Sequence, residues 1–195
     1  MFKERSDYVM MSEGKKKTVI TVKDLVRISL MGAIGILLFY FIAFPLPFFP
    51  DFLTYDAGDI PGILTCFAMG PIAGTIVQAI KAFVGLAIGA SKAGPVGALA
   101  NFLAGAAYTL VAGSYYRREK TKRKAAIAMA LGCIATAFIM GLCNYFMLMP
   151  LWGIPQASRL PLVITAILPF NLLKTAISSF VAFLLYKRIK GYFEK

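Results

Sequence analysis

Residues 169–174, Pro169-Phe170-Asn171-Leu172-Leu173-Lys174, place a carboxamide and an ammonium group in the middle of an apolar run. The run extends from Leu160 to Tyr186, long enough to cross a bilayer, which needs about 20 apolar residues. A lysine at the centre of such a helix costs roughly 2.5 to 3.5 kcal/mol, so it normally faces a partner or a watery cavity. Asn171 lies on the same helical face as Lys174. The pair is a candidate binding site, unless Lys174 reaches a headgroup and Asn171 only joins two helices.

The composition is that of an integral membrane protein. Hydrophobic residues make up 59% of the 195 residues and the mean hydropathy is +0.74, whereas soluble domains contain about 45 to 50% apolar residues. The length allows about six spans with short connections and no separate soluble domain. We therefore predict an all-α fold, a polytopic membrane protein with a bundle of six transmembrane helices.

Six apolar segments define the predicted spans: about 25–44, 59–69, 72–90, 96–116, 125–149 and 160–186. The second is short because Gly70-Pro71 breaks it. Between the first two lies a proline-aromatic stretch, 44–50, that cannot continue a helix and predicts a loop or re-entrant segment. The expected domains are a cytoplasmic basic segment (1–24), the six-helix membrane domain (25–190) and a cytoplasmic tail (191–195).

The basic residues predict the orientation. Of the 21 Lys and Arg residues, 17 precede Ile28, lie between the fourth and fifth spans, or follow the sixth. These positions share one side of a six-span protein, and the positive-inside rule places that side in the cytoplasm. Both termini are then cytoplasmic. The net charge of +12 is explained by topology and by contact with the anionic lipid bilayer, and we expect no nucleic acid partner.

Catalytic patterns are missing from the sequence. The chain has no histidine, which removes the usual general base and the commonest metal ligand. The stretch Gly85 to Lys92 lacks the spacing of a phosphate-binding loop. Asp51, Asp56 and Asp59 are a possible cation site, but a capped and solvated loop is the favoured interpretation. We predict no catalytic residues, no metal, no cofactor and no enzymatic activity.

Neutral hydrogen-bonding groups fall at one depth of the predicted bundle. Asn101, Asn144 and Asn171 all lie in the outer halves of their helices, near Lys174. An asparagine offers a donor and an acceptor side by side, which suits the edge of a planar heterocycle, and a lysine can neutralise partial negative charge on it. This set favours binding of a flat, polar-edged small molecule.

Five runs closely resemble a known family. They are Leu53-Thr54-Tyr55-Asp56-Ala57-Gly58-Asp59-Ile60-Pro61, Gly70-Pro71-Ile72-Ala73-Gly74, Gly94-Pro95-Val96-Gly97-Ala98-Leu99-Ala100-Asn101-Phe102, Asn144-Tyr145-Phe146 and Pro169-Phe170-Asn171-Leu172-Leu173-Lys174. The chain resembles the riboflavin-specific S components of energy-coupling factor (ECF) transporters, in order over all six spans. The resemblance implies a subunit in the plasma membrane of a prokaryote that captures riboflavin from outside the cell. Its partners would be a transmembrane T component and two ABC ATPase subunits, which use the ATP.

The resemblance also implies roles for single residues. Asn144, Asn171 and Lys174 would hydrogen-bond the flavin, with Asn101 as a further candidate. The loop around Tyr55 and Asp56 would close over the ligand. Ser29 and Ala33 are the nearest match to the family's Ala-x-x-x-Ala docking motif.

Two alternatives stay open from the residues. The chain could be an S component for another vitamin, such as folate, thiamine or pantothenate, or a small membrane enzyme acting on lipid. The position of Lys81 is also open, since it could reach the outer headgroups or line the cavity.

Overall fold

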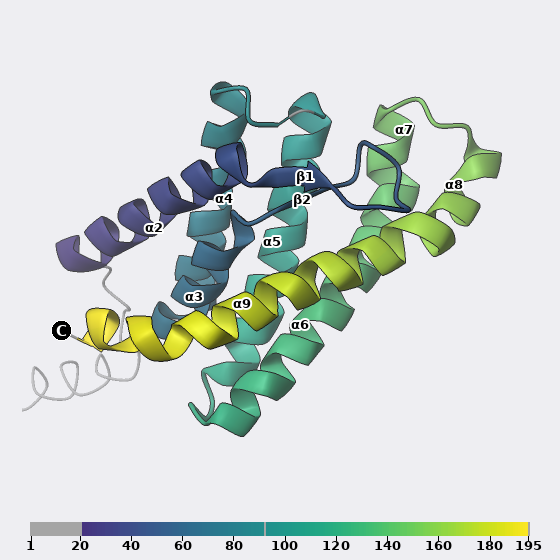
Figure 1. Cartoon of the computed structure of the whole chain (residues 1–195). Coiled ribbons are helices and arrows are strands. Elements are labelled where there is room, and N and C mark those ends of the chain that lie inside the picture. Colours follow the sequence, from purple (N-terminus) through teal and green to yellow (C-terminus); the bar gives the residue numbers. More distant parts are fainter. Residues whose placement is uncertain (1–20, 92, 195) are drawn as a thin grey trace, which may run out of the picture.

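The computed structural model describes residues 21–91 and 93–194. Of the predicted basic segment 1–24, residues 1–20 lie outside the described part. The chain is mostly helical (Figure 1). The first four helices are α2 (Val22–Phe41), α3 (Asp59–Met69), α4 (Pro71–Ala87) and α5 (Gly94–Tyr116). The rest are α6 (Lys122–Cys143), η1 (Asn144–Leu148), α7 (Met149–Leu151), α8 (Gln156–Leu162), η2 (Val163–Ile167) and α9 (Leu168–Glu194).

Four continuous helical segments are long and apolar enough to cross a membrane: 22–41, 94–116, 122–151 and 156–186. The other two, α3 and α4, have 11 and 17 residues. The predicted break at Gly70-Pro71 is confirmed, because α3 ends at Met69 and α4 begins at Pro71. Gly70 adopts φ +107°, a conformation that residues with a side chain rarely tolerate. Each predicted apolar segment thus forms a helix, four of them of spanning length.

Two π-helical segments interrupt the long helices, and each precedes a proline. The segment η1 ends at Leu148, two residues before Pro150, and η2 ends at Ile167, two residues before Pro169. A proline inside a helix donates no backbone hydrogen bond and its ring clashes with the carbonyl one turn earlier. Widening the preceding turn relieves this clash without ending the helix. The prolines therefore shape the helices beside Asn144 and Asn171.

A small hairpin corrects the purely α-helical prediction. Strands β1 (Ala43–Pro45) and β2 (Thr54–Asp56) pair antiparallel, with Phe44 opposite Tyr55. The stretch 44–50 was predicted as a loop or re-entrant segment; its first two residues, Phe44 and Pro45, belong to β1 instead, and the others lie in the connection between the strands. Pro45 is tolerated because a two-stranded sheet has only edge strands. The hairpin lies at the opposite end of the molecule from the connection between α5 and α6 (Figure 1).

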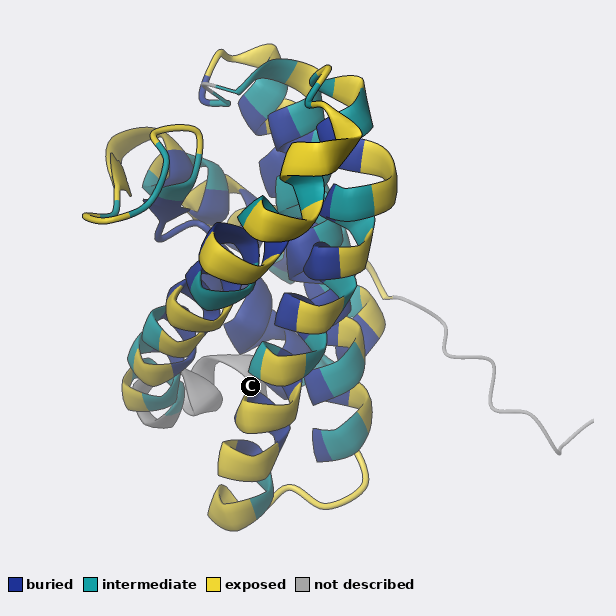
Figure 2. Cartoon of the chain, turned by 90° about the vertical axis from the view of Figure 1, so that its right-hand side faces the viewer, coloured by how far each residue is buried: buried dark blue, intermediate teal, exposed yellow. Residues whose placement is uncertain are grey.

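The helices pack around one core, and many large apolar side chains lie exposed on the outside of the bundle. The helix α4 packs against α2, α3 and α5, and α6 packs against α5 and α9. Buried positions form the inward faces of the helices and exposed positions cover the outside (Figure 2). Exposed large side chains such as Phe138, Phe180 and Leu184 would be unfavourable in water but suit a lipid environment. The protein is therefore a membrane protein built around one bundle.

Candidate functional site

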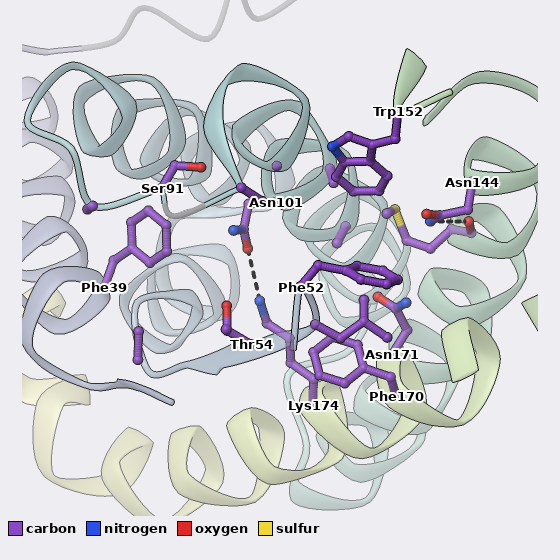
Figure 3. A pocket seen from close by; sticks show the side chains of 18 residues that line it. Phe39, Phe52, Thr54, Ser91, Asn101, Asn144, Trp152, Phe170, Asn171 and Lys174 are labelled. Atoms are coloured by element: carbon purple, nitrogen blue, oxygen red, sulfur yellow. Dashed lines mark hydrogen bonds between the residues drawn. The ribbon is translucent and has the colours of Figure 1, made fainter. Parts of the chain in front are cut away.

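The candidate site is a pocket between the hairpin, α5, the η1 region and α9 (Figure 3). The space within its walls, open mouth included, is about 680 Å³. Its polar lining includes four of the predicted residues, Asn101, Asn144, Asn171 and Lys174. The structure therefore brings the three amides and the ammonium group to one cavity.

Aromatic side chains form much of the remaining wall. Phe52 from the hairpin and Trp152 beside α7 lie with ring centroids 5.6 Å apart, and both line the pocket. Phe170 on α9 lines it as well and contacts the ring of Phe49, 5.5 Å away between centroids. Flat rings next to a few fixed polar groups suit a planar ligand with polar edges.

Asn144 and Asn171 use their amide nitrogens within their own helices. Asn144 Nδ2 donates to the carbonyl of Met140, and Asn171 Nδ2 donates to the carbonyl of Ile167, both at 2.8 Å. Each bond spans one helical turn and fixes the side chain. Each amide nitrogen keeps a second N–H, and each side-chain oxygen is an acceptor, so both amide groups can still bind a ligand that enters the pocket.

Lys174 belongs to a buried ion cluster that consists of Asp56, Asp59, Lys81 and Lys174. Lys174 Nζ lies 2.7 Å from Asp56 Oδ2 and 3.3 Å from Asp59 Oδ2, and it donates to Asn101 Oδ1 at 2.9 Å. Lys81 Nζ pairs with Asp59 Oδ1 and lies 3.4 Å from Asp56 Oδ1. Two positive and two negative charges make the cluster neutral. Such balance is required because isolated charges are very unfavourable in a buried site.

The cluster changes the interpretation of the loop aspartates. Asp56 is fully buried and Asp59 is 5% exposed, so the favoured interpretation as a solvated loop is wrong for both. Both carboxylates pair with lysine ammonium groups, whereas the sequence had suggested a bound cation as one possible partner. Asp51 is exposed. The pairing was not visible in the sequence because its members are separated by up to 118 positions.

Tyr55 and Asp56 lie beneath the pocket and are not among its lining residues. Tyr55 is 5% exposed and packs against Phe44 across the hairpin, with ring centroids 5.3 Å apart. Burial raises the pKa of the Tyr55 hydroxyl group, which therefore stays neutral at physiological pH. Both residues hold the hairpin in place, and its tip brings Phe52, Leu53 and Thr54 to the pocket.

Lys81 is a member of the site that the sequence did not assign. It is fully buried and does not line the pocket, so neither of the two options considered for it, the headgroups or the cavity wall, applies. The one available signal was a charged residue within the apolar helix that begins at Pro71. Such a residue needs a partner of opposite charge.

Gly58 is required for the path of the Lys81 side chain. A Cβ atom at position 58 would lie 2.7 Å from the Gly35 carbonyl oxygen and 2.8 Å from Lys81 Cδ. We expect Gly58→Ala to destabilise the protein by about 1 to 3 kcal/mol, the usual cost of overpacking. Thermal unfolding in detergent measures this effect. An unchanged melting temperature would show that Gly35 and Lys81 move aside at no cost to stability and that this contact is not tightly packed.

The two residues of the predicted docking motif are exposed. Ser29 and Ala33 lie one turn apart on the outer face of α2, whereas Ile28 and Gly32 face the bundle. The spacing of four places both small side chains on one face. This face is available to a neighbouring membrane protein.

Comparisons with known proteins agree with this architecture. The family described as "ECF transporter, substrate-specific component" matches residues 23–186. Riboflavin transporter RibU of Staphylococcus aureus (strain TCH60) is 35% identical over 191 residues, covering 95% of this chain and 100% of that protein. Riboflavin transporter FmnP of Bacillus subtilis (strain 168) is 31% identical over 182 residues, covering 89% and 95%.

A solved structure shares the fold. It is described as "Structure and mechanism of the S component of a bacterial ECF transporter", and it matches with a TM-score of 0.77 and 36% identity. The match covers 89% of this chain and 98% of that chain. The family match over most of the chain and the similar full-length relatives lead to one conclusion: this protein belongs to the substrate-specific (S) components of ECF transporters.

Proposed function

We propose that this protein captures riboflavin from outside the cell for ATP-driven uptake. The observation that carries the proposal is the convergence of Asn101, Asn144, Asn171 and Lys174 on one aromatic-walled pocket. Two relatives similar over nearly their whole lengths are named riboflavin transporters, which supports the same ligand here.

The pocket chemistry matches a flavin. The isoalloxazine ring is flat, and its pyrimidine edge alternates carbonyl and N–H groups. The side-chain oxygens of Asn144 and Asn171 accept from N–H or hydroxyl groups, while Lys174 Nζ donates to a carbonyl oxygen. Phe52, Phe170 and Trp152 provide apolar surface for the ring system.

The proposed assembly follows from the family. Six helices cross the plasma membrane of a prokaryote, with both termini in the cytoplasm and the hairpin outside. The exposed face of α2 that carries Ser29 and Ala33 docks on a T component, and two ABC ATPase subunits supply the energy. The sequence has no phosphate-binding loop of its own, which agrees with energy from a partner.

Ligand binding by the purified protein tests the function. We expect protein in mild detergent to be yellow, to release riboflavin on denaturation as identified by mass spectrometry, and to quench flavin fluorescence on titration. Thermal shifts with riboflavin, folate, thiamine and pantothenate distinguish the vitamins, because only a true ligand stabilises in proportion to its affinity. A colourless protein that leaves riboflavin fluorescence unquenched would contradict the proposal.

Removing either pocket asparagine should weaken binding. We expect Asn144→Ala and Asn171→Ala each to reduce riboflavin affinity by about 1 to 3 kcal/mol, the cost of leaving a buried polar partner unpaired. Gln156→Ala is the matched control, because Gln156 is an exposed amide outside the pocket. Fluorescence titration of the three variants measures the effect. Equal riboflavin affinity in the control and the pocket variants would show that neither asparagine contributes to binding.

A further inference from the structure

Lys81 is a buried cation next to the pocket but separate from it. Its Nζ atom contacts both aspartates of the buried ion cluster and lies 5.3 Å from the centroid of the Phe39 ring. Phe39 and Lys174 both line the pocket, and Lys81 does not. Any influence of Lys81 on a ligand therefore passes through these neighbours.

The two lysines divide the carboxylate oxygens evenly. The Oδ1 atoms of Asp56 and Asp59 face Lys81, and the Oδ2 atoms of the same residues face Lys174. The third contact of Lys174 Nζ is Asn101 Oδ1, a pocket atom. Lys174 thus stands between the aspartates below and the pocket above.

This division sets how strongly the aspartates attract Lys174. With Lys81 present, each carboxylate shares its charge between two ammonium groups. Without Lys81, both carboxylates would act on Lys174 alone, in a buried site where screening by water is weak. The ammonium group would then move toward the aspartates and away from Asn101 and the ligand.

We propose that Lys81 is a positioning residue that keeps the Lys174 ammonium group at the pocket surface by neutralising half of the Asp56 and Asp59 charge. This inference rests on the proposed function, because riboflavin is the ligand that reports the position of Lys174. Phe39 provides a second connection, since its ring lines the pocket and makes a cation–π contact with Lys81.

Charge balance provides the test. Lys81→Met retains the length of the side chain but leaves the cluster with one excess negative charge. We expect it to weaken riboflavin binding at neutral pH by at least about 10-fold. The double variant Lys81→Met/Asp59→Asn has one lysine and one aspartate, and we expect its affinity to return to within a few-fold of wild type. Lys124→Met is the control, because Lys124 is a partly exposed lysine at the start of α6 that pairs with Glu119 and not with the cluster.

The pH profile separates positioning from packing. In Lys81→Met the cluster carries one uncompensated negative charge, which uptake of a proton neutralises, so affinity should rise as the pH is lowered. Wild type and the double variant should show no such recovery. The other titratable groups near the cluster are Tyr55 and Tyr108, and phenols with an ordinary pKa of about 10 stay protonated as the pH is lowered.

The outcomes are distinguishable. Wild type that fails to bind riboflavin overturns the proposed function and this inference together. Wild type that binds while Lys81→Met binds equally well overturns this inference alone. A double variant that is folded but as weak as Lys81→Met, or a single variant without pH-dependent recovery, also overturns it. If Lys81→Met does not fold, the double variant decides, because the inference requires it to bind nearly as well as wild type.

Discussion

Lys174→Met is expected to abolish riboflavin binding and to lower the free energy of unfolding by about 3 to 5 kcal/mol, the cost of removing one partner from a buried ion pair. Lys174 is 4% exposed, and its Nζ atom contacts Asp56, Asp59 and Asn101. Methionine fills a similar volume, so the loss is mainly electrostatic. The two carboxylates would keep one ammonium group, that of Lys81.

Thermal unfolding and fluorescence titration in detergent measure the two effects separately. The matched control is Lys124→Met, because Lys124 pairs with Glu119 at 3.7 Å with both side chains partly exposed. Exposed pairs contribute about 0 to 1 kcal/mol, so this variant should unfold and bind like wild type. If Lys174→Met had the same melting temperature as the control, the buried ion cluster would not stabilise the fold.

Asp56→Asn is expected to release the hairpin from the bundle and to cost about 3 kcal/mol or more. Asp56 is fully buried, holds both lysines and accepts a hydrogen bond from the Gly58 backbone N–H at 3.1 Å. Asparagine retains the shape but leaves two ammonium groups facing the single carboxylate of Asp59. We expect a lower melting temperature, faster proteolysis in 43–56 and weaker riboflavin binding, because the hairpin carries Phe52 and Thr54 to the pocket.

Asp51→Asn is the control for this experiment. Asp51 lies in the same hairpin, makes the same charge change on substitution and is exposed. Surface substitutions of this kind usually change stability by less than about 0.5 kcal/mol. Equal proteolysis of the two variants would show that the hairpin is held by its apolar contacts and not by Asp56.

Local signals made much of the fold and half of the site predictable. The long apolar runs, the Gly70-Pro71 break and the isolated polar residues Asn171 and Lys174 act within one or two helical turns. Hydropathy and proline geometry therefore located the helices. The three asparagines were placed at one depth because each span has a known length. The small hairpin escaped prediction, since its strands contain only three residues each and depend on packing against the bundle.

The amino-acid sequence by itself determined that this is a helical membrane protein, and it predicted that Asn101, Asn144, Asn171 and Lys174 lie at one depth as a candidate binding site. Only the tertiary structure decided the partners of those groups. It paired Lys174 with Asp56 and Asp59, assigned Lys81 to the same cluster, and turned the amide nitrogens of Asn144 and Asn171 toward their own helices. The physical reason is that hydropathy is a property of each segment, whereas the balance of buried charges depends on which distant segments meet.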